Sequence, residues 1–192
     1  MQIDGEIEMK PTLVVLLLGS LLHSPYSMAA DIYESFGSGK AEISSYTITE
    51  PRYGELHQGT QVLIFVPEDL NKKTLIKPDD FRTLNEKNKL PVFKMNRVLK
   101  FNTGIYDYSV MTTVFSSIKN NFKPAKISLS SSEWCGNVFA MLTTSPQKAK
   151  YVLHSYFESE GDKTSIIDWK SPVIYEDNLP ILIRELQGSF LK

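Results

Sequence analysis

Residues 126–142 read KISLSSSEWCGNVFAML and guide the interpretation of the rest of the chain. The first half alternates, with Ile127 and Leu129 separated by serine, and the second half ends in a solid apolar run. Alternation with a period of two is typical of a strand that buries one face. Gly136 permits a turn or a bulge beside Cys135, the only cysteine of the chain. The stretch therefore predicts two adjoining strands or one bent strand.

Similar strand patterns lie on both sides of this stretch. A phase change between Ile43 and the pair Tyr46 and Ile48 predicts a bulge in the first strand. Further strands are expected at 61–66, 92–101, 105–118, 150–157 and 164–169. Turns are expected at 51–54, 58–59, 102–104, 120–124, 145–146 and 160–162, and Pro67 is expected to end its strand.

Two segments break the strand pattern. Residues 67–91 are polar and of mixed charge, which predicts a solvated loop with a short helix at 78–84. Residues 176–186 carry Leu179, Ile183 and Leu186 at helical spacing, which predicts one amphipathic C-terminal helix. The fold class is therefore mainly β, a curled antiparallel meander of about eight strands that forms an open or half barrel, with one terminal helix. No glycine-rich phosphate-binding motif occurs in the sequence, which disfavours a parallel nucleotide-binding sheet.

The N-terminal region resembles a secretory signal. Lys10 precedes an apolar run at 12–22, which is shorter than a membrane span, and small residues at Ser27 and Ala29 predict cleavage after Ala29. After the signal, one helical turn is expected at 32–36. The acidic residues at 1–8 conflict with a basic signal start, so translation from Met9 is the interpretation we favour. An uncleaved anchor or a buried helix is the alternative.

Export has consequences for the domain at 30–192. We expect a periplasmic or secreted single domain without a transmembrane segment and, with one cysteine, without an internal disulfide. No cysteine lies near the cleavage site, which disfavours a lipid anchor. The formal charge of the whole chain is −1, so nothing in the charge favours nucleic acid as a partner.

Cys135 is the first candidate for chemistry. A nucleophilic thiol needs a base, and His154 in a neighbouring predicted strand could supply it, with Glu133 or Asn137 orienting the imidazole. The interpretation we favour is a buried thiol packed against Trp134, because free cysteines are among the most buried residues. Histidine and cysteine do not recur at zinc-ligand spacing, so neither a metal nor another cofactor is expected.

Aromatic residues give the second set of candidates. Large rings recur in the predicted strands, where they could line an apolar pocket or fill the core. A polar and aromatic group that also includes Glu55 could rim such a pocket. The candidate ligand-binding residues are Tyr46, Arg52, Tyr53, Tyr106, Tyr108, Trp134, His154 and Tyr156.

Two blocks of sequence, E-W-C-G at 133–136 and H-S-Y-F-x-x-E-x-D at 154–162, resemble an uncharacterised family of exported bacterial envelope proteins and lipoproteins. The segments at 39–66 and 101–115 share this resemblance, which implies export and carries over no catalytic residue. Some members are labelled septum formation inhibitor Maf, but the S-x-S-P-R-R type motif of that nucleotide pyrophosphatase does not occur in the domain at 30–192. A meander with a terminal helix is also similar to periplasmic lipoprotein carriers with unclosed barrels.

Three hypotheses for function follow. The first is a non-enzymatic envelope protein that holds an apolar or lipid-like ligand, or a protein partner, in a curled sheet. The second is a cysteine-dependent hydrolase that uses Cys135 and His154. The third is a scaffold module without a ligand.

Overall fold

The computed structural model describes residues 40–168 and 173–186. The predicted signal at 1–29, the predicted helical turn at 32–36 and Trp169 lie outside these ranges.

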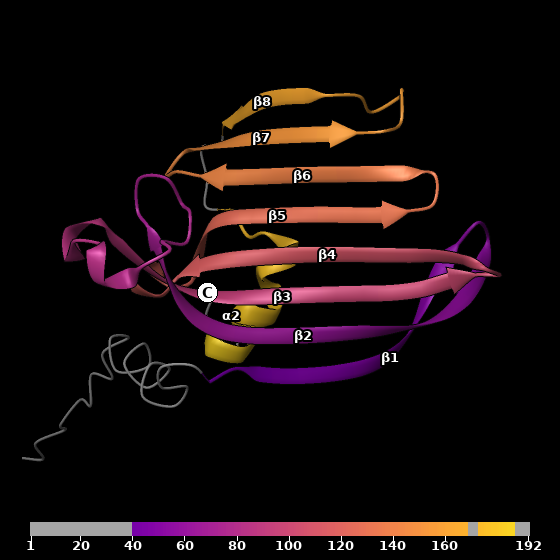
Figure 1. Ribbon diagram of the computed structural model, residues 1–192, viewed down its shortest axis with the longest axis horizontal. Coiled ribbons are helices and arrows are strands. Elements are labelled where there is room, and N and C mark those ends of the chain that lie inside the picture. The colour runs from indigo at the N-terminus through magenta and orange to yellow at the C-terminus, as the bar shows by residue number, and fades with distance from the viewer. Residues whose placement is uncertain (1–39, 169–172, 187–192) are drawn as a thin grey trace, which may run out of the picture.

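Within these ranges, eight antiparallel strands follow one another, and each pairs with the next (Figure 1). Their bounds are β1 (Glu42–Arg52), β2 (Glu55–Asn71), β3 (Lys89–Thr103), β4 (Tyr106–Ser117), β5 (Lys123–Glu133), β6 (Gly136–Thr144), β7 (Lys148–Ser155) and β8 (Lys163–Asp168). The C-terminal helix α2 (Leu179–Leu186) follows a single 3-10 turn at Glu176–Asn178. The predicted fold class, a mainly β meander with one terminal helix, is confirmed.

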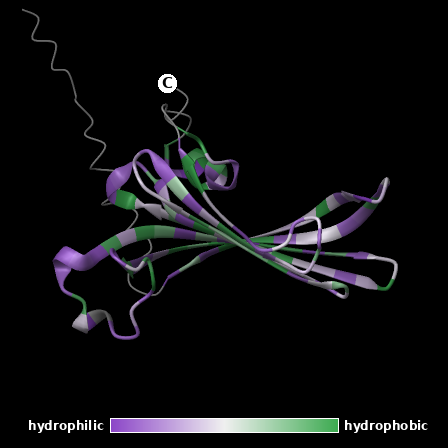
Figure 2. Ribbon diagram, turned by 90° about the horizontal axis from the view of Figure 1, so that it is seen from above, coloured by the Kyte–Doolittle hydropathy of each residue, from purple (hydrophilic) through white to green (hydrophobic). Residues whose placement is uncertain are grey.

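The sheet is open, because β1 and β8 stand at opposite ends of the strand order. Figure 2 shows that it twists along its strands without closing. The twist is the ordinary result of strands built from L-residues. The sheet is neither a closed barrel nor strongly curled, so the curl expected from the sequence is weak.

The main core lies where α2 covers one end of one face of the sheet, as Figure 1 shows behind β2 and β3. Phe93, Met95 and Val114 are fully buried there, together with Ile181 from the helix. Their register explains the grouping, since Met95 lies opposite both Phe65 and Val114 across neighbouring strands. Directly opposed residues share a face of the sheet, and this face is the one that the helix covers.

Polar contacts fix the helix on this face. Buried Asn178 donates from Nδ2 to the carbonyl of Phe122 at 2.9 Å and accepts from Ser116 Oγ at 2.6 Å. Arg97 also pairs with Asp177 at 3.0 Å, just before the helix. An amide that bonds on both sides holds one orientation, because any shift would leave a buried group unsatisfied.

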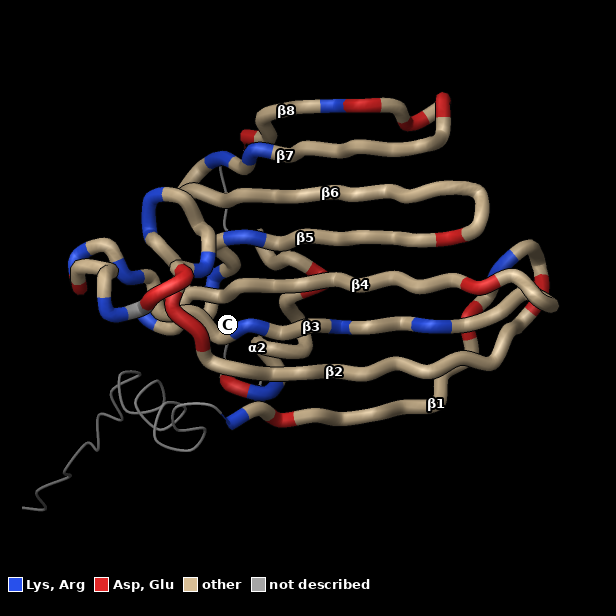
Figure 3. Tube along the Cα trace, viewed as in Figure 1, with Lys and Arg blue, Asp and Glu red and all other residues tan. Residues whose placement is uncertain are grey.

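The hairpins predicted from the sequence are present. Residues 126–142 form two strands, β5 and β6, joined by Trp134 and Cys135. The connection of β3 to β4 is also tight, with Thr103 paired to Tyr106. Figure 3 shows that charged residues are concentrated near the ends of the strands and in the long loop, while the middles of the strands are mostly uncharged.

Three local predictions in the first two strands were wrong. The register of β1 with β2 has no shift, so the bulge at 41–49 is absent. Ile43 is instead 67% exposed on the face opposite Tyr46, because an edge strand does not need one apolar face. Gln58 and Gly59 lie inside β2, where a Cβ at Gly59 would stand 2.6 Å from the carbonyl oxygen of Lys100. This glycine serves close strand packing rather than a turn.

Pro67 does not end its strand, because it pairs with Phe93 and β2 continues to Asn71. The shift in register that the sequence placed in β1 occurs instead between β4 and β5, beside Phe115 and Ser116.

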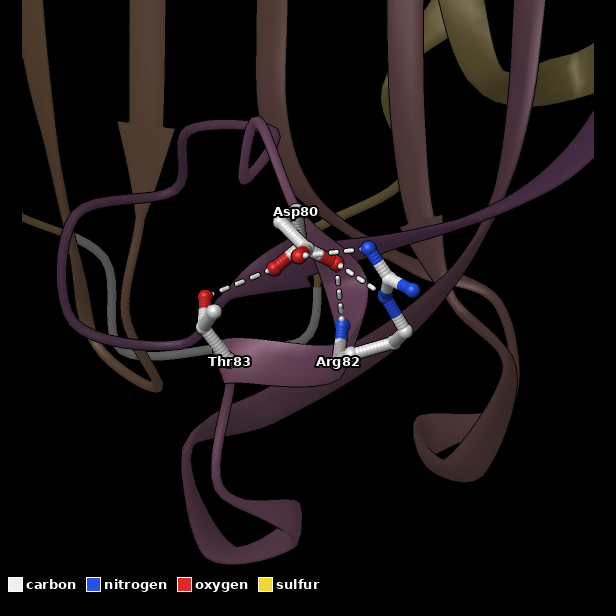
Figure 4. A network of polar contacts seen from close by, with 3 residues as sticks. All are labelled: Asp80, Arg82 and Thr83. Carbon is white, nitrogen blue, oxygen red and sulfur yellow. Dashed lines mark hydrogen bonds and ion pairs between the residues drawn. The ribbon is translucent and has the colours of Figure 1, made fainter.

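The long polar loop at 72–88 contains short 3-10 turns instead of the predicted helix at 78–84. Asp80 accepts bonds from the backbone N–H, Nε and Nη2 of Arg82 at 2.9, 3.0 and 3.1 Å, and its carbonyl accepts from Thr83 Oγ1 (Figure 4). The Arg82 side chain, followed by its backbone N–H, lowers the pKa of the Asp80 carboxyl. Such local bonds compete with a continuing helix.

Candidate functional site

Three hairpin turns meet at the end of the sheet that α2 leaves uncovered (Figure 1). They are Tyr53-Gly54, Gly104-Ile105 and Trp134-Cys135. Tyr53 and Gly54 both have positive φ, at 53° and 81°, as a type I′ hairpin turn requires. The first hairpin therefore carries a tyrosine at its tip.

Side chains from these hairpins form one connected group, here called the aromatic end: Arg52, Tyr53, Phe101, Tyr106, Tyr108 and Trp134. The Phe101 and Tyr108 rings stack with centroids 4.7 Å apart and planes 4° apart. Tyr106 lies 5.2 Å from Tyr108 and 5.3 Å from Trp134, both tilted. The series thus crosses from β3 through β4 to the turn after β5.

Hydroxyl and cation contacts join the first hairpin to this series. The Tyr53 and Tyr108 hydroxyls are hydrogen bonded at 2.9 Å. The Arg52 guanidinium lies 4.8 Å from the Tyr53 ring centroid and 5.2 Å from that of Tyr108. The bond to Tyr53 is the main cause that raises the pKa of Tyr108, and the hydrogen bond to Tyr108 raises the pKa of Arg52. At neutral pH Tyr108 is therefore uncharged and Arg52 is positively charged. The contacts of the Arg52 guanidinium with the two rings are cation–π interactions.

Burial changes steeply across the aromatic end. Phe101 and Tyr108 are buried, whereas Trp134 is 61% exposed and Tyr53 is 73% exposed. The buried rings of Phe101 and Tyr108 therefore support the exposed rings of Trp134 and Tyr53. Exposed rings held by packing from below lose little conformational entropy when another molecule covers them.

Cys135 is exposed in the β5–β6 turn, so the favoured prediction of a thiol packed in the core was wrong. The residue lies in a turn because Glu133 pairs with Gly136 and leaves only two residues to reverse the chain. Its backbone N–H donates to the Tyr106 hydroxyl at 2.6 Å. Contact with the Cys135 side chain is the main cause that raises the pKa of Tyr106, so this phenol is protonated at neutral pH and is no base for the thiol.

His154 is not placed beside the thiol. It pairs with Phe139, three residues beyond Gly136 along β6, which is about 10 Å of strand. Its Nδ1 lies 3.3 Å from Asp162, and both side chains are largely exposed. The structure therefore does not assemble the Cys135–His154 pair that the hydrolase hypothesis requires. Of the predicted orienting residues, Glu133 lies near Tyr106 and Asn137 pairs with Ser132.

Five of the eight predicted ligand-binding residues come together at the aromatic end, and the other three do not. Tyr156 lies next to the turn, against Gly136, where a Cβ would stand 2.3 Å from the Tyr156 Cγ. Tyr46 pairs with Gln61 in the middle of β1. Phe101, which the sequence did not single out, forms the base of the group. Its position just before the Asn-Thr-Gly turn, facing a tyrosine across the hairpin, is the signal that could have found it.

A cavity lies at the other end of the sheet. Its volume is about 380 Å³, and it is lined by residues near the β4–β5 and β6–β7 turns and by Tyr175. None of the predicted ligand-binding residues lines it.

Within residues 40–168 and 173–186, no three side chains of histidine, cysteine, aspartate or glutamate are grouped to hold a metal ion. In the same ranges, no helix has the length and apolar character needed to cross a bilayer. No protein-family model matches the chain, and neither a curated protein nor a solved structure matches it.

Proposed function

We propose that this chain is a non-enzymatic binding protein of the bacterial cell envelope, and that a protein partner binds its aromatic end. The observation that carries the proposal is the pair of exposed rings, Trp134 and Tyr53, held at the corners of a stacked base. Tryptophan, tyrosine and arginine are the residues that most often supply the binding energy of protein interfaces. All three types occur here within one connected group.

The geometry favours a protein partner over an enclosed lipid-like ligand. A lipid-like ligand is usually held in an enclosed apolar cavity. The exposed rings of the aromatic end, Trp134 and Tyr53, lie instead on an open surface, and the cavity of about 380 Å³ lies at the other end of the sheet with a partly polar lining. A partner that presents apolar side chains to the rings and a carboxylate to Arg52 would match this surface.

The proposal is tested by site-specific photocrosslinking in the cells that produce the protein. A photoreactive phenylalanine analogue replaces Trp134 in one variant and Ile166 in a matched variant. Ile166 is 57% exposed on β8, at the far edge of the sheet from the first hairpin. We expect a discrete protein adduct from position 134 and none from position 166.

A second substitution separates a specific contact from a chance collision. Adding Tyr53→Ala should remove the adduct at position 134, because truncation of an interface anchor costs about 2 kcal/mol or more. Adducts of equal yield at both positions would contradict the proposal. An adduct with lipid alone at position 134 would favour the lipid-carrier hypothesis instead.

A further inference from the structure

Strand β1 is an edge of the sheet, and its charged residues and proline, Glu42, Glu50, Pro51 and Arg52, lie only near its two ends. It is 11 residues long, pairs with β2 without a bulge and contains no lysine, and its only proline is Pro51, next to its last residue. Natural edge strands are commonly blunted by lysine, proline, bulges or short length, because their free N–H and C=O groups can pair with another chain. No other described strand pairs with the outer side of β1 (Figure 1).

The turn after β1 determines which backbone groups point outward. In the two-residue turn at Tyr53-Gly54, the flanking pair is Arg52 and Glu55, and a turn of this kind bonds the carbonyl of its first residue to the N–H of its fourth. The backbone groups of Arg52 therefore point toward β2. Because the direction alternates along a strand, the backbone groups of Thr49, Thr47 and Ser45 point away from β2.

The outward groups permit antiparallel pairing with a second copy of β1 about a two-fold axis through Thr47. In this register Ser45 faces Thr49 of the second copy, and both present outward backbone groups. Residues on the same face of the sheet also meet, since Tyr46 faces Ile48 of the second copy. Tyr46 is 47% exposed in the single chain, so this pairing would cover apolar surface on both sides of the axis.

Charge supports the same register. Glu42 and Arg52 are the first and last residues of β1, and pairing through Thr47 places each opposite the other of the second copy, where Arg52 would join the ion pair that Glu42 makes with Arg184 at 2.6 Å in its own chain. A two-fold axis through Ser45 would place Glu42 opposite Ile48, and one through Thr49 would place Arg52 opposite Tyr46. Both shifted registers lose the two pairs of opposite charge and shorten the paired segment. Opposite charges directly across a strand pair stabilise it.

We propose that the chain forms a two-fold dimer through β1, in which the two eight-stranded sheets become one continuous sheet. The strand itself supplies the self-complementary surface that a two-fold interface requires. The dimer interface and the aromatic end have Arg52 in common, but Thr47 belongs only to the first and Trp134 only to the second.

The test uses Thr47, which would face its own copy across the axis and whose side chain is exposed in the single chain. Thr47→Lys and Thr47→Glu each place like charges opposite one another, so each variant alone should be monomeric by light scattering or analytical ultracentrifugation. An equimolar mixture of the two should form a heterodimer, because the charges then become complementary. The unmodified chain should be dimeric, and Thr164→Lys on exposed β8 should leave it dimeric.

Two results would overturn the proposal. One is an unmodified chain that stays monomeric at all concentrations, and the other is a dimer that persists in both single variants. Circular dichroism of each variant confirms that the sheet is intact. Trp134→Ala should leave the mass unchanged, so failure of the dimer and failure of the proposed partner surface give different results.

Discussion

The environment of Cys135 in the structure differs from the one that its neighbours in the sequence predict. Its neighbours, an apolar run on one side and alternating serines on the other, are typical of a strand interior. The pairing of Glu133 with Gly136 places it in a two-residue turn, where the thiol is exposed. Gly136 has a structural role too, because the Tyr156 side chain occupies the space where a Cβ would stand.

The exposed thiol leads to the first prediction. Native protein should react with a thiol reagent without denaturant, and Cys135→Ala should change the free energy of unfolding by no more than about 0.5 kcal/mol, as is usual for surface substitutions. Labelling kinetics with and without urea provide the measurement. Labelling that occurs only after unfolding would show that the thiol is packed in the native state.

Tyrosines of the aromatic end lead to a prediction about pH. The pKa values of Tyr106 and Tyr108 are raised above the usual 10.0, the first mainly by contact with the Cys135 side chain and the second mainly by the bond to Tyr53. In the unfolded chain both phenols would ionise at a lower pH than in the folded chain. The stability from these contacts is therefore complete below pH 10 and is lost as the pH rises above it.

Denaturant unfolding across the alkaline range, read beside the absorbance of tyrosinate, provides the measurement. In Tyr53→Phe, Tyr108 should ionise at lower pH than in the unmodified chain, because its main bonding partner is lost. An unchanged titration would mean that the hydroxyl bond does not hold in solution.

At the scale of elements, the contact between α2 and the sheet depends on a buried polar residue. Asn178→Ala leaves the Phe122 carbonyl and the Ser116 hydroxyl without their bonds. We expect a loss of about 1–3 kcal/mol, the cost of leaving buried polar groups unsatisfied. The measurement is equilibrium unfolding in urea. The matched control is Glu176→Ala in the same 3-10 turn, where the side chain is exposed and the loss should be small. Equal losses in both variants would contradict this role of Asn178.

For the whole molecule, the uneven cover of the sheet predicts uneven stability. Strands β3 and β4 supply most of the fully buried side chains beneath α2, whereas every residue of β8 is exposed. Local opening is easiest where few apolar contacts are buried. In hydrogen exchange, amides of β8 should therefore exchange much faster than those of β3 and β4. Uniform protection across all eight strands would contradict this description.

Much of the fold could be predicted from the sequence, because the relevant signals are local. The hairpin about Asn102-Thr103-Gly104 and the helix after Pro172 follow from turn residues and from helical spacing. Predictions of turns from glycine and proline were wrong where these residues have another role in a strand. Gly59 allows close strand packing and Pro67 lies within a strand, although both residues are also typical of turns.

The order of the strands and the C-terminal helix can be read from the amino-acid sequence alone, since alternation, glycine turns and helical spacing act between near neighbours in the chain. It also indicated most residues of the aromatic end. The folded chain, and not the sequence, shows that Arg52, Tyr108 and Trp134 belong to one surface and that His154 does not join Cys135. Such groupings depend on strand register, on the twist of the sheet and on where α2 packs. Those features arise from contacts between segments far apart in the sequence.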